Sequence, residues 1–585
     1  MAGGLARGPL GRAALPGGAA RPLHPADRRR LDHQGGAAAA GTVSNVLLHL
    51  ETPEGARELS ATPAEAAGSL AELLARRGVP LNTRCGGRGL CSGCEVAVRC
   101  GELGGLAGRG RTVPDARGNV RACQVRLGPG NEFRVAVPAR SLLRHTPEVV
   151  SEFCVRIPWA RDPLAPTVRY GAAVDIGTTT VALLVCDLTE GKVVAEASGF
   201  NAQIRFGEDV LTRIQLCAND RAAIGRLQRA IGAETLQPLL AEACGRAGLG
   251  WEEIGVMVVA ANTTMLHLLA GVDPTPMGTH PFTPAFLEHR HYAPRDLGLE
   301  FGTGDTRVHL LPGPAAYVGA DLAAGIVATG LLYDDGPALL VDVGTNGEII
   351  AKVGDRLVGC ATAAGPAFEG AGLSCGVRGV HGAIERVRMA VDPLAVECEV
   401  IGGAARPIGL CGSAYVDLLW EGRRLGILGA NGRLTPEFAR RAGDALQADD
   451  WGRKLRLHAH GAAGAIWVSE VDVARLLQAK AAIAAGIATL LGLLGTTPAA
   501  VKHVYLAGGF GLHLSLEHAI GCGLLPGFTE SQISVVGNTS LGGAFLALND
   551  QSLLEEAKTA CRQMESIELN LVPGFEDAYI DHLSL

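Results

Sequence analysis

Short apolar runs and alternating patterns predict a mixed α/β protein along most of the chain. Between residues 44 and 138, two strand patterns precede an amphipathic helix pattern that ends at Gly78, and an alternating strand pattern follows at 94–100. From residue 170 onward, apolar strands alternate with helical patterns, and a long apolar stretch at 473–495 predicts a buried helix. The 585 residues are too many for one hydrophobic core, so we expect several domains.

One of these strand patterns occurs twice. The stretch YGAAVDIGTTTVALLVCDLTEGKVVAEA is an apolar strand that ends in Asp, a Gly-Thr hairpin, a second strand, a polar turn and a third strand. The stretch PALLVDVGTNGEIIAKVGDRLVGC repeats this order, and its Asp342 lies 167 residues beyond Asp175. Two copies of one unit predict a duplicated fold.

Each hairpin is suited to binding phosphate. Its glycine lets the main chain approach an anion, the N–H groups that follow can point at phosphate oxygens, and the Asp can hold Mg²⁺ through water. Two facing hairpins would clamp a polyphosphate such as that of ATP, and no P-loop signature competes with this interpretation. The predicted nucleotide contacts are Gly177, Thr178, Thr179, Thr180, Gly344, Thr345 and Asn346, with Asp175, Asp342 and Glu348 as candidate catalytic residues.

A third glycine-containing segment supports a nucleotide site. The stretch VKHVYLAGGFGLHL at 501–514 predicts a strand, a Gly508-Gly509 turn and then a helix, an arrangement on which a purine can lie flat. We therefore add Gly508, Gly509 and Phe510 to the candidate nucleotide contacts. The stretch NTSLGGA at 538–544 predicts a further helix start and is a weaker signal.

The stretch RCGGRGLCSGC at 84–94 is the strongest local signal for a metal cluster. Its C-x5-C-x2-C spacing, with a distant fourth cysteine, is typical of a [2Fe–2S] ferredoxin, in which glycines let backbone N–H groups face the sulfur atoms. A zinc site, a disulfide and inert thiols are less favoured, since a zinc site usually pairs two C-x2-C knuckles. Cys100 competes for the fourth position but shares a predicted strand with Cys94. The predicted ligands are Cys85, Cys91, Cys94 and Cys123.

Composition and charge narrow the classes of function. The net charge of −7 gives no support to nucleic-acid binding, and no apolar run suggests a membrane span. The remaining cysteines are scattered through apolar stretches, which favours reduced thiols and a cytoplasmic location. Residues 81–150 hold eleven Arg against five acidic residues, so a basic surface that docks an acidic partner is one interpretation and a merely solvated face is the other.

Together, DIGTTT, DVGTNGE, LAGGFG and NTSLGGA resemble the motifs of the ASKHA superfamily, which contains acetate and sugar kinases, heat-shock chaperone ATPases and actin. A β-grasp [2Fe–2S] ferredoxin joined to this fold resembles the reductive activators of corrinoid proteins, as do NAQIRFGEDVLTRI, ANTTMLHLLAG and GPAFEGAGLSCGVRG. The resemblance implies ATP-dependent one-electron reduction of a corrinoid protein from Co(II) to Co(I). It also implies a low-potential electron donor and a possible homodimer.

The resemblance also implies a domain layout. It gives a ferredoxin domain at 44–138 and a linker at 139–169. Residues 1–43 depart from the family pattern, and their composition predicts a disordered Ala/Gly/Arg-rich extension or a misplaced start, with an organelle-targeting peptide as the minor interpretation. The middle domain at 170–333 is the first ASKHA lobe, and the C-terminal ASKHA ATPase domain spans 334–585. Two further functions remain open, a small-molecule kinase with a redox-sensing cluster and an ATP-driven chaperone of corrinoid proteins.

Overall fold

A computed structural model describes most of the chain from residue 46 to its end. The described residues are 46–52, 55–81, 83, 89, 94–106, 118–130, 132–138, 141–142, 153–207, 209–344, 346–404, 406–449, 452–461 and 464–585. The extension at 1–43 and the predicted site residues Cys85, Cys91 and Thr345 lie outside them.

The N-terminal region is built on one mixed sheet with the strand order β2-β1-β7-β3-β5. Strand β1 pairs antiparallel with β2 and parallel with β7, and β3 pairs antiparallel with both β7 and β5. Helix α2 starts at a capping box on Ser69 and buries its leucines in the core beside this sheet. These elements confirm the strands and the helix predicted here. Their bounds are β1 (Val46–Thr52), β2 (Gly55–Ala61), α1 (Pro63–Ala66), α2 (Leu70–Arg76), β3 (Glu95–Cys100), β4 (Leu103–Gly105), β5 (Asn119–Arg121), β6 (Val125–Leu127) and β7 (Glu132–Ala136).

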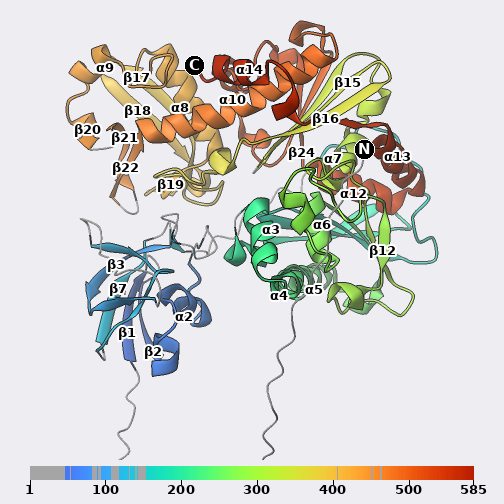
Figure 1. Ribbon diagram of the computed structural model, residues 1–585, viewed down its shortest axis with the longest axis horizontal. Coiled ribbons are helices and arrows are strands. Elements are labelled where there is room, and N and C mark those ends of the chain that lie inside the picture. Colours follow the sequence, from blue (N-terminus) through green and yellow to red (C-terminus); the bar gives the residue numbers. More distant parts are fainter. Residues whose placement is uncertain are drawn as a thin grey trace, which may run out of the picture. The chain divides into compact units, whose positions relative to one another are not determined.

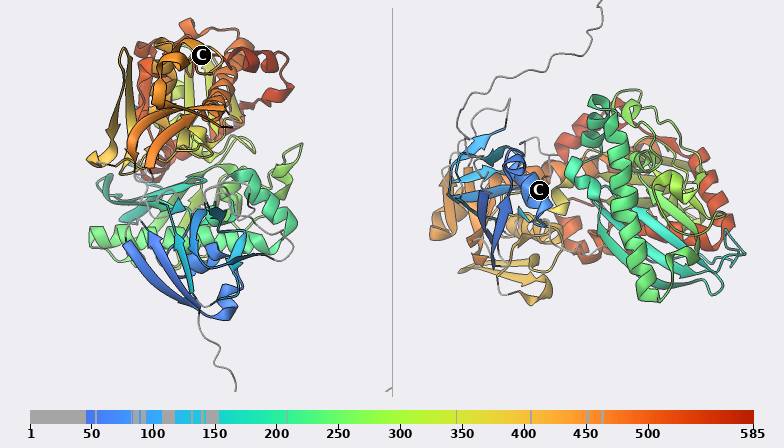
Figure 2. Two further views of the ribbon diagram at one scale, coloured as in Figure 1. Left: turned by 90° about the vertical axis from the view of Figure 1, so that its left-hand side faces the viewer. Right: turned by 90° about the horizontal axis from the view of Figure 1, so that it is seen from below.

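The next part of the chain forms a six-stranded sheet with the order β10-β9-β8-β11-β13-β12, which we call the first lobe. Strands β8 and β9 are apolar and almost wholly buried, as expected for strands that are covered on both faces. Helix α5 packs along β9 and β10 on one face (Figure 2). The bounds are β8 (Tyr170–Ile176), β9 (Thr180–Asp187), β10 (Lys192–Phe200), α3 (Val210–Asn219), α4 (Ala222–Ile231), α5 (Gln237–Ala247), β11 (Ile254–Ala261), α6 (Thr263–Leu269), β12 (Arg290–Tyr292) and β13 (Arg307–Leu310).

The second lobe has a six-stranded sheet with the order β24-β23-β14-β15-β16-β25. Its long helix α10 packs on β15 and β16 (Figure 1). The bounds are α7 (Ala320–Thr329), β14 (Ala338–Val343), β15 (Gly347–Val353), β16 (Arg356–Thr362), α8 (Gly412–Arg424), α10 (Glu470–Leu493), β23 (His503–Ala507), α11 (Leu516–Gly521), β24 (Ile533–Gly537), α12 (Thr539–Asn549), α13 (Gln551–Gln563), β25 (Glu565–Ser566) and α14 (Phe575–Asp581).

Two small three-stranded sheets are inserted into the second lobe. Their strand orders are β18-β17-β19 and β20-β21-β22. The first of them packs on α8, and α10 contacts β21 and β22 of the second. The bounds are β17 (Ala383–Val391), β18 (Leu394–Val400), β19 (Gly409–Leu410), α9 (Pro436–Arg441), β20 (Leu446–Asp449), β21 (Gly452–Gly461) and β22 (Gly464–Ser469).

Five strands of each six-stranded sheet share one topology, which confirms the predicted duplication; the sixth strands, β12 and β25, lie at opposite edges. In each, three consecutive strands form an antiparallel meander, β8-β9-β10 or β14-β15-β16. A later strand, β11 or β23, then pairs parallel with the first strand of the meander, and another parallel strand follows it. In both lobes, the hairpin between the first two strands is the predicted phosphate-binding turn.

Two segments connect or cover the lobes. Helix α12 packs on β8 and β11 of the first lobe and on α7, so a helix from the end of the chain completes a core near its middle. From Phe153 onward, the expected linker packs on the same helix, with Phe153 and Trp159 both against Phe545. Helix α10 is long and apolar enough to cross a membrane, but it is mostly buried within the protein.

Candidate nucleotide cleft and cluster ligands

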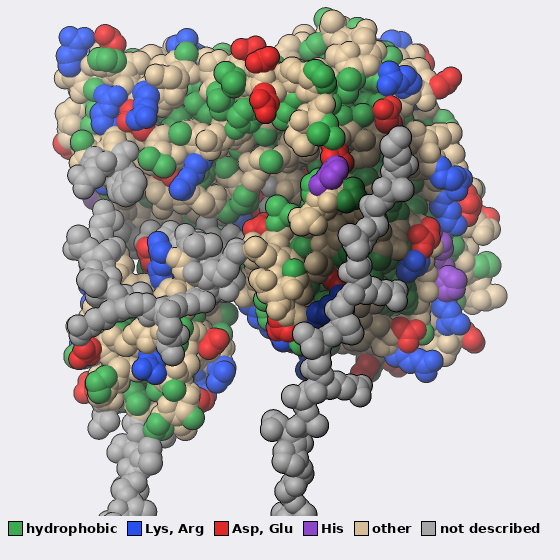
Figure 3. Space-filling view, viewed as in Figure 1, with side chains coloured by type: hydrophobic (Ala, Val, Ile, Leu, Met, Phe, Trp, Pro, Cys, Tyr) green, Lys and Arg blue, Asp and Glu red, His purple; other side chains and the backbone are tan. Residues whose placement is uncertain are grey.

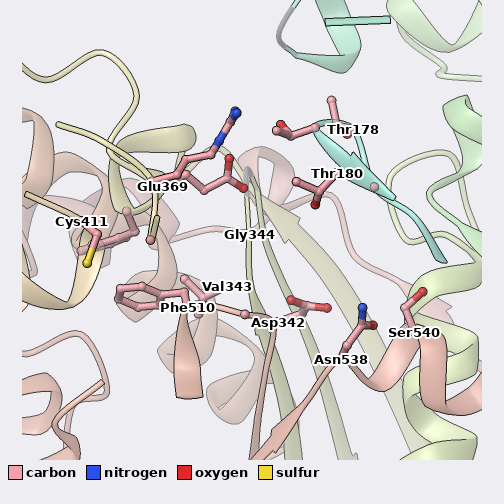
Figure 4. Close-up of a pocket in the computed structure, with 18 of the residues that line it drawn as sticks. Thr178, Thr180, Asp342, Val343, Gly344, Glu369, Cys411, Phe510, Asn538 and Ser540 are labelled. Atoms are coloured by element: carbon pink, nitrogen blue, oxygen red, sulfur yellow. The ribbon is translucent and has the colours of Figure 1, made fainter. Parts of the chain in front are cut away.

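A cleft of about 710 Å³ brings the two predicted hairpins together. In Figure 4, Thr178 and Thr180 lie opposite Gly344 and Glu369, and Asp342 lies below them. Every predicted nucleotide or catalytic residue that the structure describes lines this cleft. These residues are Asp175, Gly177, Thr178, Thr179, Thr180, Asp342, Gly344, Asn346, Glu348, Gly508, Gly509 and Phe510.

Side chains from distant segments hold the first hairpin by its carbonyl groups. Asn201 Nδ2 donates to the Gly177 carbonyl oxygen at 3.0 Å, and the fully buried Arg213 donates to the Thr178 carbonyl oxygen. Asn262 Nδ2 donates to Thr178 Oγ1 at 3.1 Å. Because side-chain donors already hold these two carbonyl oxygens, the hairpin forms a preorganised cradle before any ligand binds. Asn201 and Arg213 both belong to the stretch NAQIRFGEDVLTRI, so one role of this stretch is to hold the first hairpin in place.

Asp175, at the end of β8, is held by the start of α12. Asn538 Nδ2 donates to Asp175 Oδ2 at 2.9 Å, and Ser540 Oγ donates to Asp175 Oδ1 at 2.7 Å. The Asn538 side chain cannot turn over freely, because its Oδ1 accepts from Leu541 N as the N-cap of the helix. Burial raises the pKa of Asp175 above its usual value, and the two hydrogen bonds oppose this shift.

The second hairpin carries a group of half-buried acids that line the cleft. The antiparallel register of β14 and β15 sets Asp342 directly opposite Glu348, and Asp321 joins them from the first turn of α7. Burial, followed by the neighbouring carboxylates, raises the pKa of Asp342 and of Asp321 to about 7. The same causes raise the pKa of Glu348 well above its usual value. Bound positive charge would therefore favour the ionised forms of all three.

The far end of the cleft is apolar and suits a purine. Gly508 has a φ of +90°, and a Cβ there would lie 2.9 Å from Asp342 Oδ1, so only glycine lets this turn pass so close. The ring of Phe510 packs on Phe368 at 5.2 Å between centroids and lies near Cys411 (Figure 4). The helix expected directly after Gly509 is instead a short 3₁₀ turn, and α11 begins at Leu516.

Sequence reasoning missed several residues that line the cleft. Asn538 was predicted only as part of a helix start. Asp321 carried a usable signal, because a single acidic residue at the start of the otherwise apolar helix α7 is unusual in a buried segment. Asn262, Glu369, Arg378 and Ser540 lie in stretches that resemble the family, ANTTMLHLLAG, GPAFEGAGLSCGVRG and NTSLGGA, but the resemblance did not assign these residues to the site. The missed residues include Asn262, Asp321, Glu369, Arg378, Asn538 and Ser540.

Two of the four predicted cluster ligands are described, and they lie together. Cys94 and Cys123 are 1% and 5% exposed, whereas Cys100 is exposed. A hydrogen bond from the Cys94 thiol is the main reason that the pKa of Cys123 falls to about 6; burial opposes it, and Gln124 Nε2 assists by donating to Cys123 Sγ at 3.3 Å. A thiolate is the form that binds metal. Cys85 and Cys91 lie outside the described residues.

Comparisons with known proteins identify the family. A family model described as "C-terminal domain of RACo the ASKHA domain" matches residues 336–585, and one described as "RACo middle region" matches 170–334. The corrinoid activation enzyme RamQ of Eubacterium limosum is 32% identical over 424 residues, which cover 70% of this chain and 69% of RamQ. The chain belongs to the family of corrinoid reductive activators.

Two further members of the corrinoid activator family agree. The Co(II) methylated amine-specific corrinoid protein reductase of Methanosarcina barkeri is 26% identical over 289 residues, covering 46% of this chain and 49% of that protein. The solved structure of a reductive activator for corrinoid, iron-sulfur protein is 29% identical, with a TM-score of 0.65, and covers 92% of this chain and 98% of that one. The duplicated lobes of the present family member are therefore an ASKHA, actin-like ATPase fold.

Proposed function

We propose that this chain uses ATP to drive the one-electron reduction of a corrinoid protein from Co(II) to Co(I), through a [2Fe–2S] cluster in its N-terminal domain. The observation that carries the proposal is the single cleft lined by both phosphate-type hairpins, in a chain whose relatives are named for corrinoid activation and corrinoid protein reduction. The N-terminal sheet, with β1 and β7 parallel and a helix beside them, supports a β-grasp ferredoxin domain.

The cysteines suit a cluster of this type. Cys94 and Cys123 approach each other from separate segments and are shielded from water, the lowered pKa of Cys123 favours its thiolate, and Cys85 and Cys91 supply the other two sulfur atoms. Such a cluster supplies a site that accepts and releases single electrons. The protein's own contribution is a cradle in which Gln124 and the Gly89 N–H direct hydrogen bonds at Cys123 sulfur, which stabilises negative charge there.

The cleft suits ATP with Mg²⁺. The first hairpin offers N–H groups from a braced backbone, and the carboxylates of Asp175 and Asp342 line the same cleft. Among the described residues, no three His, Cys, Asp or Glu side chains converge on one metal position. That arrangement fits Mg²⁺, which keeps several of its waters and takes few direct protein ligands. The metal would neutralise phosphate charge as the nucleotide binds.

The electron donor and the corrinoid partner bind outside this cleft. Of the eleven Arg in residues 81–150, Arg99, Arg121, Arg126 and Arg134 are described, and the rest lie outside the described residues. On the face shown in Figure 3, the described basic and acidic side chains are interspersed. We propose an acidic surface on the partner, because the sequence around the cysteines is basic.

The proposal is tested with anaerobic protein, a low-potential reductant and a Co(II) corrinoid protein, by following the absorbance of the Co(I) corrinoid. Wild type should reduce the corrinoid with ATP and much more slowly without it. Cys91→Ala should abolish reduction and keep ATP hydrolysis, and Cys154→Ala, an exposed thiol in the expected linker, should match wild type. Equal rates with and without ATP, or full reduction by Cys91→Ala, would contradict the proposal.

A further inference from the structure

The cleft is strongly acidic for a site that receives a polyphosphate. Six carboxylates line it, and Arg378 is the one Lys or Arg among its described lining residues. ATP with one Mg²⁺ still carries net negative charge, which these carboxylates repel. The Arg378 guanidinium therefore contributes strongly to the attraction between the cleft and a nucleotide phosphate, and its position bears on which phosphate it can bind.

Arg378 is presented by a loop of fixed shape. The loop joins η8 (Pro366–Glu369) to β17, and within it Gly370 has a φ of +74°. A Cβ on Gly370 would collide with the Val377 backbone, so the loop folds back on its own start just before Arg378. Val377 N also donates to the Leu410 carbonyl oxygen at 2.8 Å, which ties the residue before Arg378 to β19. The arginine thus projects from an anchored turn.

The Arg378 guanidinium lies close to the first hairpin. It sits over the ring of Phe200, 5.4 Å from the ring centroid. Phe200 ends β10 of the first lobe and directly precedes Asn201, whose backbone N–H donates to the Thr179 carbonyl oxygen at 2.8 Å. Arg378 belongs to the second lobe, so this contact joins the two lobes beside the phosphate cradle.

We propose that Arg378 is the cation that binds the terminal phosphate of ATP, and that Phe200 holds its guanidinium near that position until the nucleotide arrives. This inference rests on the proposed ATP site. Arginine forms charge-assisted, often paired hydrogen bonds to phosphate, and Phe200 is one of the groups that the guanidinium contacts without nucleotide. We expect the guanidinium to leave Phe200 for phosphate when ATP binds. ADP lacks the terminal phosphate and would not draw it away, so the contact between the lobes would differ between the two nucleotides.

The test compares Arg378→Ala, Arg378→Lys and Arg388→Ala in the full-length protein with its cluster. Arg388 is an exposed arginine on β17 that pairs with Glu399 at 2.6 Å and does not line the cleft. Calorimetry would measure the affinity for ADP and for a non-hydrolysable ATP analogue, and a steady-state assay would give kcat and KM for ATP.

We expect Arg378→Ala to bind the ATP analogue about 10- to 100-fold more weakly while its ADP affinity changes by less than about threefold. Its kcat should fall by about 100-fold or more, as for other groups that stabilise developing charge. Arg378→Lys should recover part of both losses because it keeps the charge, and Arg388→Ala should match wild type. If Arg378→Ala keeps the wild-type preference for the ATP analogue over ADP, this inference is wrong although the proposed function stands. If wild type binds neither nucleotide, both are wrong.

Discussion

The two hairpins have the same sequence pattern and the same place in duplicated sheets, yet the structure holds them differently. The acid of the first hairpin, Asp175, has two side-chain donors from α12, and three further side chains brace the turn. The acid of the second hairpin, Asp342, has no hydrogen-bond donor on its carboxylate in the described part of the chain. It faces other carboxylates instead, and its pKa rises to about 7.

This difference shows that the two copies of a duplicated motif can have different roles. The first hairpin is preorganised, because protein donors already satisfy its acid and its carbonyl groups. The second hairpin is electrostatically incomplete, because burial and nearby carboxylates raise its pKa values until positive charge arrives. Asp175 and Glu369 act on Asp342, and Asp342 in turn acts on Asp321 and Glu348. We infer that the first hairpin positions the nucleotide and that the second responds to the bound cation, so ligand binding has its largest effect on the second lobe.

The sharpest test of this division replaces each acid by its amide. Asp342→Asn and Asp175→Asn should both lower kcat for ATP hydrolysis by about 100-fold or more, because each removes a carboxylate that we propose holds Mg²⁺. Their stabilities without ligand should differ. Asp342→Asn removes a half-buried charge that faces other carboxylates, whereas Asp175→Asn sets an amide N–H₂ against the fixed Asn538 amide. Thermal and urea unfolding at pH 8 should therefore show Asp342→Asn as the more stable by about 1–2 kcal/mol.

Asp355 provides a matched control for these variants, because it is exposed in the turn between β15 and β16. Asp355→Asn should leave both kcat and the unfolding free energy close to those of wild type. If the two hairpin variants proved equally stable, the hydrogen bonds that hold Asp175 would not contribute to stability, and the proposed difference between the hairpins would be wrong.

A second test uses pH. The pKa values of Asp342 and Asp321 are about 7 in the folded protein, against 3.8 ordinarily, so the folded state binds more protons than the unfolded state between these values. The free energy of unfolding of the ligand-free protein should therefore fall as pH rises from about 4 to 7, and this contribution should level off above about pH 8. We expect a total change on the order of 2 kcal/mol, to be measured by urea unfolding from pH 5 to 8.5.

Two further measurements separate the contribution of these acids from that of the other titrating groups. Asp342→Asn should flatten the pH dependence while Asp355→Asn keeps it, since other titrating groups are common to both. Saturating Mg²⁺ with ATP should raise stability more at pH 8 than at pH 5.5, because bound cation stabilises the ionised acids. A wild-type stability that rises with pH in this range, with the same slope in Asp342→Asn, would contradict the electrostatic account of the second hairpin.

The parts of the site that the sequence predicted are those with a local signature. A glycine after a buried strand and a run of hydroxyl side chains indicate a phosphate turn within a few residues, and both hairpins were found in this way. The donors to Asp175 lie 363 and 365 residues away, so no local pattern could pair them with it. The same limit hid Arg378, whose relation to Phe200 exists only once the two lobes have folded together.

The linker shows a second limit on what can be predicted from the sequence. Its prolines indicate a connection without regular structure, and residues 153–169 form no helix and no named strand, but Phe153 and Trp159 pack on Phe545 of α12. Composition predicts the local conformation of such a segment and does not predict which surface its aromatic rings will cover. The bounds of the linker and of the ferredoxin domain remain predictions, as do the roles of Cys85 and Cys91.

The smallest expected effect belongs to a single brace of the first hairpin. Ser540→Ala removes the 2.7 Å hydrogen bond to Asp175 and keeps the one from Asn538, so it should destabilise the protein by about 1 kcal/mol. ATP affinity should fall only about two- to fivefold, because the remaining donors still fix the turn. Ser531→Ala, at an exposed serine before β24, is the control and should change neither quantity. If Ser540→Ala weakened ATP binding as much as Asp342→Asn does, the first hairpin would depend on each contact separately and would not be a preorganised cradle.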